Sequence, residues 1–253
     1  MDAKRDSFGR PLIIPPDGGK PVAYRRCTTF IDVLSDRSAL ERWKQRKTAI
    51  GLSKRKDLLL RVATSKHDNK KLDEVCEWAL KASGSDSSAN IGTAIHSLTE
   101  EIDRGNTPEI PEDFAKDIQA YLAATKHLTM KSIEVFVVND DLKVGGTFDR
   151  VVYLPNDIGG GADLVADLKT GSIHFDAGKI AMQLAVYANS VVYDVATGER
   201  TPLDASRMRG LVIHLPQGEG KCSVLEADLV AGWQGAQLAA DVWAWRAKKG
   251  FLT

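Results

Sequence analysis

Residues 144–171 read VGGTFDRVVYLPNDIGGGADLVADLKTG, a pattern of two β-branched, alternating segments on either side of a connection rich in proline and glycine. Alternation of this kind predicts strands over 144–154 and 164–168. The turn-forming residues between the strands predict that they pair as a hairpin.

Three charged side chains of the hairpin indicate its chemistry. Asp167 and Lys169 lie two positions apart and therefore on one face of their strand, and Asp149 lies on the partner strand. Pairing would bring both carboxylates and the ammonium together at the end of the sheet. A carboxylate between apolar neighbours is costly unless it is paired or bound to a cation. An ordinary ion pair on a surface hairpin is one interpretation, and a metal site is the other.

A hard divalent cation fits these groups best. Mg²⁺ is usually held in proteins by one or two carboxylates together with substrate phosphates. We expect Asp149 and Asp167 to bind Mg²⁺ or Mn²⁺, with the exposed backbone carbonyl of Leu168 as a third oxygen ligand. Lys169 would lie beside the metal-bound water, where it could orient the water or offset charge on a phosphate. The predicted reaction is phosphodiester hydrolysis.

Helical and strand-like periods alternate around the hairpin, which predicts an α/β fold. Helical spacing runs through 27–81, and the polar segment Ser83–Ser88 predicts a mobile link. Further helices are predicted over 72–82, 91–104, 112–126, 176–195 and 229–249, and further strands over 133–138, 207–215 and 222–227. We expect an extended surface arm over 1–24, a helical, basic portion over 25–90 and the main core over 91–253.

Five short motifs occur in a fixed order along the chain. They are Gly92-Thr93-Ala94-Ile95-His96, Glu134, Gly146-Thr147-Phe148-Asp149, Asp167-Leu168-Lys169-Thr170-Gly171 and Gln183-Leu184-Ala185-Val186-Tyr187. The ordered set resembles the RecB-like exonucleases of the PD-(D/E)xK nuclease superfamily, which include CRISPR-associated adaptation nucleases and phage recombination exonucleases. The resemblance covers residues 91–190 and extends more weakly to 27–52.

The resemblance implies a restriction-endonuclease-like core, which is a central mixed sheet flanked by helices in αβββαβ order. It also implies that His96 is a metal ligand and that Glu134, Gln183 and Tyr187 are auxiliary site residues. Each of these also has a simpler interpretation. His96 could satisfy a buried helix face, Glu134 could face solvent, and Gln183 and Tyr187 could be routine contacts between a helix and the sheet.

The function implied by the resemblance is that of a Mg²⁺-dependent DNA exonuclease in recombination, repair or replication, with a phage origin as one alternative. Its substrate would be linear single- or double-stranded DNA, and a recombination or replication protein would be a fitting partner. One rival is a structure-specific endonuclease of the same fold. Another is a catalytically inactive DNA-binding or recombination-partner module.

Two cofactors of related nucleases and motors are not expected. Several RecB-like nucleases hold an iron–sulfur cluster with four cysteines, whereas this chain has three cysteines, and a four-thiolate cluster needs four. The segment Gly218-Glu219-Gly220-Lys221-Cys222 lacks the first glycine and the Ser/Thr of a nucleotide-binding P-loop. We therefore expect neither an iron–sulfur cluster nor a bound nucleotide.

The charges are balanced in total but divided along the chain. Lys+Arg and Asp+Glu number 34 each, while residues 1–90 alone hold 19 basic and 12 acidic residues. The basic excess lies mainly between Arg37 and Lys71. These basic side chains could bind the phosphates of a nucleic acid, or they could form an ordinary solvated helix face. The candidate DNA-binding residues are Trp43, Lys44, Arg46, Lys47, Lys54, Arg55 and Lys56.

No segment contains the roughly 20 consecutive apolar residues that a membrane-spanning helix needs. The N-terminus is charged and polar, and the cysteines form no Cys-x-x-Cys pair. We expect no membrane association, inert or buried thiols, and the reducing cytoplasm of a bacterial or phage-infected cell.

Overall fold

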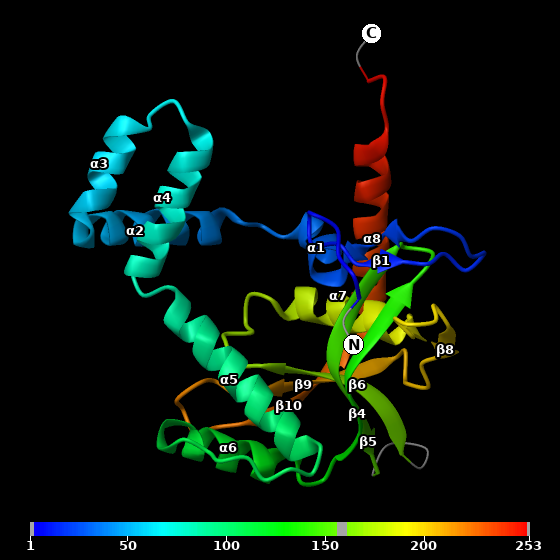
Figure 1. Ribbon diagram of the computed structural model, residues 1–253. Coiled ribbons are helices and arrows are strands. Elements are labelled where there is room, and N and C mark those ends of the chain that lie inside the picture. The colour runs from blue at the N-terminus through cyan, green and yellow to red at the C-terminus, as the bar shows by residue number, and fades with distance from the viewer. Residues whose placement is uncertain (1–2, 156–160, 252–253) are drawn as a thin grey trace. The chain divides into compact units, whose positions relative to one another are not determined.

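The two polar strands pair as an antiparallel hairpin, β5 (Val144–Leu154) and β6 (Ala162–Lys169), as the sequence predicted (Figure 1). The structure is a computed structural model that describes residues 3–251 apart from 156–160 and the side chains of 86–89. The glycine-rich connection expected at 156–160 therefore lies outside the described residues.

The hairpin is the centre of a mixed sheet. In the described part of the chain, eight strands form this sheet in the order β10–β9–β6–β5–β4–β7–β8, with β3 alongside β5. The pairs β3–β5 and β6–β9 are parallel, and the other neighbouring strands are antiparallel. The remaining strands are β3 (Arg25–Arg26), β4 (Thr129–Asn139), β7 (Val191–Tyr193), β8 (Arg200–Pro202), β9 (Arg209–His214) and β10 (Ser223–Asp228).

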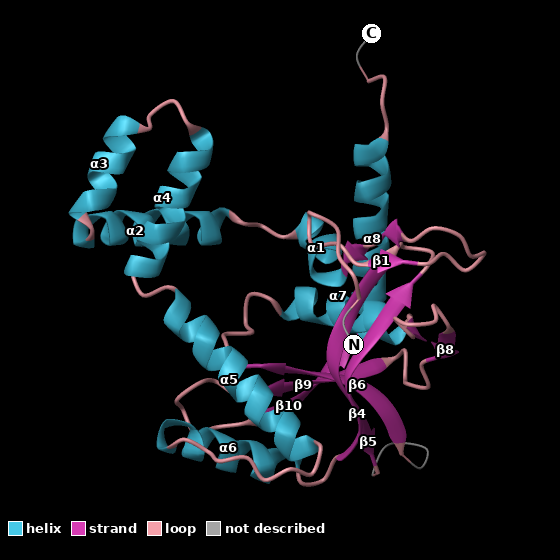
Figure 2. Ribbon diagram, in the orientation of Figure 1, coloured by secondary structure: helices cyan, strands magenta, loops and turns pink. Residues whose placement is uncertain are grey.

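Helices flank the sheet (Figure 2). The helices α7 (Ala177–Ala188) and α8 (Leu229–Ala247) share a buried apolar cluster with Val165 and Val212 of the sheet. The short helix α1 (Cys27–Ile31) packs into the same cluster. The chain is thus a mixed α/β protein with its main core between the sheet and these helices.

A second cluster joins two more helices to the sheet. Ile95 of α5 (Asp86–Asp103) and Tyr121 of α6 (Glu112–Thr125) pack against Leu168 of β6. Leu168 and Val165 lie an odd number of positions apart on one strand, so the two clusters occupy opposite faces. Among the described helices, none is both long and apolar enough to cross a membrane.

The predicted helix over 176–195 is too long. α7 ends at Ala188, and the residues after it form β7, which pairs with β4. The hydroxyl of Ser190 donates a hydrogen bond back to the carbonyl of Val186, and the side chain of Asn189 does the same to Ala185. These contacts end the helix, and the β-branched residues Val191 and Val192 that follow pair with β4 in the sheet.

Most described residues of the N-terminal segment are exposed, as expected, but the segment is also anchored in the core. Its strands β1 (Leu12–Ile13) and β2 (Val22–Ala23) form a separate hairpin. Ile13 and Tyr24 are fully buried beside strands of the main sheet, and the hydroxyl of Tyr24 donates to Asp140 at 2.7 Å. The prolines and glycines prevent a helix but do not prevent this packing, because the apolar residues between them reach the core.

The described chain divides into two units. Unit 1 comprises Met1–Ser35 and Ile95–Thr253, and unit 2 comprises Asp36–Ala94. The helical portion expected over 25–90 therefore begins later than predicted, because α1 belongs to the core of unit 1. The predicted mobile link over 83–88 is also shorter, since α5 already begins at Asp86.

Unit 2 is built from the helices α2 (Ser38–Lys54), α3 (Lys56–Thr64) and α4 (Asn69–Ala82). Leu58, Val75 and Ala79 form its small buried core. The helix predicted over 72–82 is confirmed within α4. Helix α2 crosses α4 so closely at Gly51 that a Cβ there would lie 1.7 Å from the carbonyl oxygen of Ala79.

Candidate functional site

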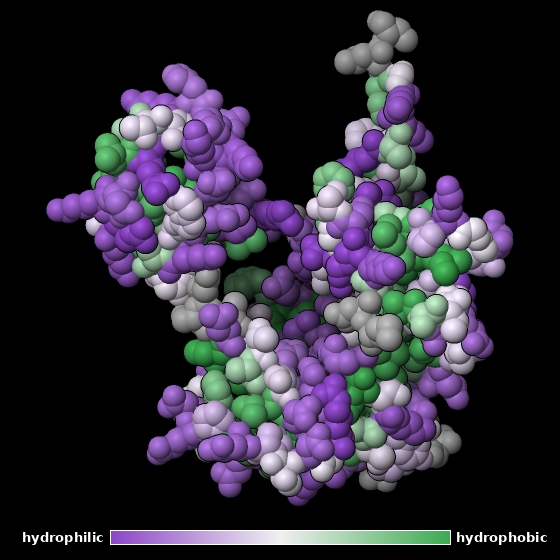
Figure 3. Space-filling model, in the orientation of Figure 1, coloured by the Kyte–Doolittle hydropathy of each residue, from purple (hydrophilic) through white to green (hydrophobic). Residues whose placement is uncertain are grey.

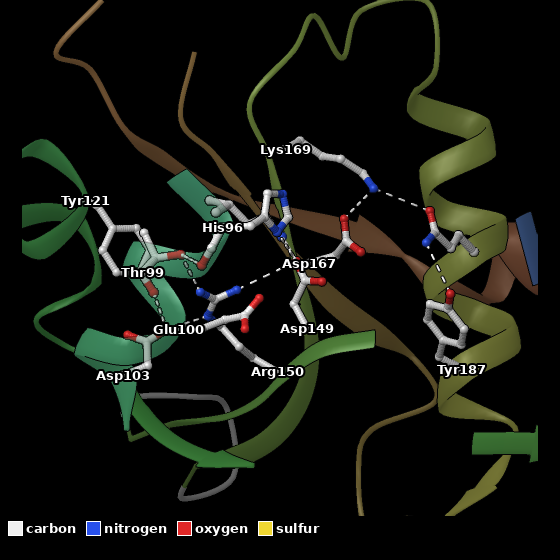
Figure 4. A network of polar contacts seen from close by, with 12 residues as sticks. His96, Thr99, Glu100, Asp103, Tyr121, Asp149, Arg150, Asp167, Lys169 and Tyr187 are labelled. Carbon is white, nitrogen blue, oxygen red and sulfur yellow. Dashed lines mark hydrogen bonds and ion pairs between the residues drawn. The ribbon is translucent and has the colours of Figure 1, made fainter. Parts of the chain in front are cut away.

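Carboxylates of the two hairpin strands meet near the carboxyl end of β6 (Figure 4). Continuing the antiparallel register of β5 and β6 by one position sets Asp149 opposite Asp167. The side chains are 14% and 6% exposed. Oδ2 of Asp149 lies 3.5 Å from Nδ1 of His96 on α5. The structure therefore places Asp149 beside both Asp167 and His96, while the three side chains are not close enough to form a complete metal site by themselves.

Leu168 differs from the expectation of an exposed carbonyl. The residue is fully buried, and it pairs with Ile213 of β9 in the interior of the sheet. Its backbone N–H donates a hydrogen bond of 2.7 Å to Oδ2 of Asp149. The amide of Leu168 thus orients a carboxylate, and a ligand role for its carbonyl stays a prediction.

Lys169 lies between the carboxylates and helix α7. Its ammonium is 2.5 Å from Oδ2 of Asp167 and donates a hydrogen bond of 3.4 Å to Oε1 of Gln183. Gln183 in turn donates to the hydroxyl of Tyr187 at 3.3 Å. The two predicted auxiliary residues of α7 therefore reach the site through Lys169, one turn of helix apart. Gly146 permits this approach, because a Cβ there would lie 3.0 Å from the ring of Tyr187.

The charge at Asp167 is unfavourable without a cation. Burial and then the neighbouring Asp149 carboxylate raise its pKa to about 6, although Lys169 and His96 act in the opposite direction. Oδ2 of Asp167 is buried and accepts no hydrogen bond of good geometry within the described chain. The ammonium of Lys169 lies within ion-pair distance of that atom. Burial and the second carboxylate therefore outweigh Lys169 and His96 in their effect on the pKa of Asp167.

A second pair of carboxylates lies next to the first. Glu134 stands opposite Asp149 in the register of β4 and β5, and its backbone adopts a positive φ of 55°. Partial desolvation, and then the carboxylates of Glu100 and Asp149, raise the pKa of Glu134 to about 7. The structure thus joins Glu134 to the site, together with Glu100, which the sequence analysis did not select.

A buried arginine lies beside the carboxylate of Asp149 and links its strand to helix α5. The side chain of Arg150 is fully buried and donates hydrogen bonds of 2.6 Å to Asp103 and 2.8 Å to Thr99. Asp103 also accepts a hydrogen bond of 2.7 Å from the hydroxyl of Tyr121. The remaining nitrogen, Nη1, lies 3.6 Å from Oδ2 of Asp149 (Figure 4). Arg150 therefore fixes α5 and α6 against the strand that carries Asp149.

The donor set suits a hard divalent cation with water in its coordination shell. Among the described residues, no group of three or more His, Cys, Asp and Glu side chains is close enough to hold a metal by itself. One or two carboxylates with several waters are the usual protein contribution to a Mg²⁺ site. Asp149 and Asp167 meet that requirement, and the hydrogen-bond deficit of Asp167 Oδ2 would be met by an ion.

No protein-family model matches this sequence, and no curated protein matches it either.

The residues predicted to bind DNA all lie in unit 2, along α2 and at the start of α3. Trp43 is 38% exposed, and the ammonium of Lys47 lies 5.9 Å from the centre of its ring. Arg55 is paired with Asp57 through hydrogen bonds of 2.8 and 2.6 Å. Lys44, Arg46, Lys54 and Lys56 are exposed. The face of unit 2 seen in Figure 3 is largely hydrophilic, in keeping with a surface of charged side chains.

The residues that sequence reasoning missed carried weak local signals. Glu100 and Asp103 follow His96 by four and seven positions, which puts all three on one face of α5. Arg150 directly follows Asp149, but alternation along a strand points the two side chains apart. The helix face was detectable from spacing, whereas the contact of Arg150 with α5 depends on tertiary packing.

Proposed function

We propose that the chain is a divalent-metal-dependent DNA exonuclease of the RecB-like group of PD-(D/E)xK nucleases, active in DNA recombination, repair or replication. The observation that carries the proposal is the meeting of Asp149, in the middle of β5, with Asp167 and Lys169 at the carboxyl end of β6. Two largely buried carboxylates could bind a divalent cation, and a cation with a lysine beside it could activate water and offset charge during phosphodiester hydrolysis.

The order of elements supports the finer fold assignment within this proposal. When α6, β7 and β8 are treated as additions, the remaining elements α5, β4, β5, β6, α7 and β9 follow the αβββαβ order of a restriction-endonuclease-like core. The strand order β9–β6–β5–β4, with β9 parallel to β6, agrees with a crossover through α7. Asp149 and Asp167 lie on β5 and β6, which are the two middle strands of this set.

The roles of the residues follow from their contacts. Bound Mg²⁺ or Mn²⁺, held by Asp149 and Asp167 with His96 beside them, would supply the Lewis acidity that activates water and offsets charge on the phosphate. Lys169 presents its ammonium at this place, where it can donate to the attacking water or to a phosphate oxygen. Gln183 and Tyr187 hold Lys169 against α7. The basic residues of α2 and α3 would bind phosphates of the DNA.

Replacement of Lys169 tests the proposal. The Lys169→Ala variant should lose Mg²⁺-dependent degradation of linear DNA while its circular dichroism spectrum stays that of the wild type. Lys126→Ala, which removes an exposed lysine at the end of α6, is the matched control and should degrade DNA normally. Undiminished degradation by Lys169→Ala would overturn the mechanism.

Two further assays separate the rival functions. End-labelled single- and double-stranded linear DNA and covalently closed circles should be compared with Mg²⁺ present, and cleavage of intact circles would identify an endonuclease. Calorimetric titration with Mn²⁺ in the absence of DNA should give a binding heat that Asp149→Asn/Asp167→Asn removes. Absence of carboxylate-dependent binding would favour an inactive DNA-binding module.

A further inference from the structure

Unit 2 contains a basic cleft that the proposed catalytic residues do not use. It has a volume of about 330 Å³ and is lined by Arg55, Arg61, Trp78, Lys81 and Ala82. Arg61 belongs to α3, and Trp78 and Lys81 belong to α4. We call it the α3/α4 cleft.

The two helices that line the α3/α4 cleft are held together by a buried apolar core. Leu58 of α3 is buried against Val75 and Ala79 of α4, so the two helices are held together beneath the cleft. Trp78 and Lys81 lie on either side of Ala79 along α4. The helices that carry Arg61, Trp78 and Lys81 are therefore fixed relative to each other before a ligand arrives, which lowers the entropy lost on binding.

The cleft combines positive charge with an aromatic surface. Arg55 is engaged by Asp57 through two hydrogen bonds, so Arg61 and Lys81 are the cations that the cleft offers to a ligand. The guanidinium of Arg61 lies 4.9 Å from the centre of the Trp78 ring. Trp78 is 37% exposed, which leaves part of its indole open to solvent. A planar group with an adjacent negative charge fits this arrangement.

We propose that the α3/α4 cleft binds one nucleotide of single-stranded DNA, with Arg61 and Lys81 contacting phosphates and the base stacking on Trp78. Grooves that combine cations with aromatic rings are the usual means of binding single strands without sequence preference. The volume of the cleft is at the lower end of the roughly 300–1,000 Å³ of small-ligand pockets, which suits a single nucleotide. In a duplex the bases stack on one another and are not available to Trp78.

The inference rests on the proposed function, because it takes DNA as the substrate. It adds to that function a preference for an unpaired strand at a place remote in sequence from the catalytic residues. It also assigns DNA binding to Arg61, Trp78 and Lys81, none of which belongs to the row of basic residues on α2.

Anisotropy of a labelled single-stranded oligonucleotide with the full-length protein tests the cleft, in EDTA so that no hydrolysis occurs. Loss of two phosphate contacts in Arg61→Ala/Lys81→Ala should reduce the slope of log affinity against log salt by about 1.4, at about 0.7 per single-strand contact. The charge-matched control is Lys66→Ala/Lys70→Ala, which removes two exposed lysines of unit 2 that do not line the cleft. Equal slopes for the two double variants would overturn the proposal.

The stacking contact is tested separately at Trp78. Trp78→Ala should weaken single-strand binding by about tenfold, since one base stacked on an aromatic ring contributes about 1–3 kcal/mol. Trp78→Phe retains a ring and should keep most of the affinity, while losing the part of the fluorescence quenching that oligonucleotide causes at Trp78. Equal affinity of Trp78→Ala and the wild type would contradict stacking.

The same series distinguishes other occupants and the two proposals from each other. Tighter binding of duplex than of single strands, or competition by polyglutamate that depends on Trp78, would replace the single-strand site by a duplex or protein-docking surface. If linear DNA is not hydrolysed but the cleft variants lose binding, the nuclease proposal fails and the cleft stands. If DNA is hydrolysed and the cleft variants bind like the control, the cleft proposal fails alone.

Discussion

Arg150 is the residue whose removal should cost the fold most. It is fully buried, and its guanidinium pairs with Asp103, so Arg150→Leu would leave a buried carboxylate without its cation. Breaking one side of a buried ion pair typically costs about 3–5 kcal/mol. We therefore expect the free energy of unfolding of Arg150→Leu, measured in urea, to fall by about 3 kcal/mol or more.

Arg104→Leu is the matched control for this prediction. Arg104 pairs with Glu100 and Glu101 but its side chain is 38% exposed, so its loss should cost only about 0–1 kcal/mol. The double variant Asp103→Asn/Arg150→Leu should recover part of the loss, because Asn carries no charge. A loss for Arg150→Leu as small as that for Arg104→Leu would show that the network is not a structural support.

Glu134 should make the stability of the metal-free protein depend on pH. Its pKa in the fold is about 7 against an ordinary 4.5, so the folded chain binds this proton more tightly than the unfolded chain. As the pH rises from 4.5 to about 7 the fold loses stability, and above 7 the loss is complete. Glu134→Gln should therefore melt above the wild type at pH 8 in EDTA and no higher than the wild type at pH 4.

Exposed Glu109 provides the comparison for Glu134. If Glu109→Gln gave the same gain at pH 8, the effect would belong to the overall charge of the chain and not to the cluster of carboxylates. Addition of Mg²⁺ at pH 8 should reduce the advantage of Glu134→Gln, since a ligand that binds only the folded state stabilises it.

The candidate site was predictable from sequence where its residues are close together or regularly spaced. Asp149, Asp167 and Lys169 could be placed together because strand alternation and one hairpin determine their positions. The support from Arg150 and the electrostatic influence of Glu100 on Glu134 could not be predicted. Both depend on how closely α5 approaches β4 and β5, and that distance is set by packing between segments far apart in sequence.

At the scale of elements, the crossing of α2 and α4 should be the most sensitive contact of unit 2. A methyl group at Gly51 would overlap the carbonyl of Ala79, so Gly51→Ala must move the helices apart and loosen the core around Leu58. Overpacking of this kind costs about 1–3 kcal/mol. We expect Gly51→Ala to unfold at lower urea concentration, as followed by tryptophan fluorescence.

Gly178 is the control for Gly51. It also lies in a helix, α7, but a Cβ there would meet no atom within 4 Å. Gly178→Ala should be neutral or slightly stabilising, since alanine is the better helix former. Equal destabilisation by both substitutions would mean that the close approach of α2 and α4 does not limit the stability of unit 2.

The predicted elements were right where the apolar residues follow one periodicity, and wrong where helical and strand periodicities overlap. The strand over 144–154 was predicted with its observed bounds, and α6 ends within one residue of its prediction. The segment 176–195 kept apolar residues at both helical and strand spacing, so its boundary depended on the hydrogen bonds of Asn189 and Ser190. The N-terminal hairpin depended on burial of Ile13 and Tyr24 against distant strands, which no local pattern indicates.

At the scale of the whole molecule, the unequal distribution of charge between the two units predicts that DNA binding and hydrolysis can be lost independently of each other. Unit 2 holds 13 Lys+Arg and 8 Asp+Glu, and the rest of the chain holds 21 and 26. Asp149→Asn/Asp167→Asn should abolish hydrolysis but bind linear DNA in EDTA at least as tightly as the wild type. The variant has lost negative charge, so repulsion of the phosphates is weaker.

The opposite variant removes cations from α2. Lys44→Ala/Arg46→Ala/Lys47→Ala should lower the slope of log affinity against log salt by about 2, because each phosphate contact contributes about 0.7–0.9. Affinity should be measured between low and physiological salt for both variants and the wild type. An unchanged slope would place the DNA on another surface.

The discontinuity of unit 1 has a consequence for biosynthesis. Phe30 and Ile31 are buried in a cluster completed by α7 and α8, which are made only after the whole of unit 2 and the central strands. Unit 2 is a continuous segment with its own core, so it can fold while the ribosome is still translating the central strands. Folding of unit 1 must wait until α7 and α8 have been made, and during that interval Phe30 and Ile31 are exposed apolar residues of the nascent chain that need protection from aggregation.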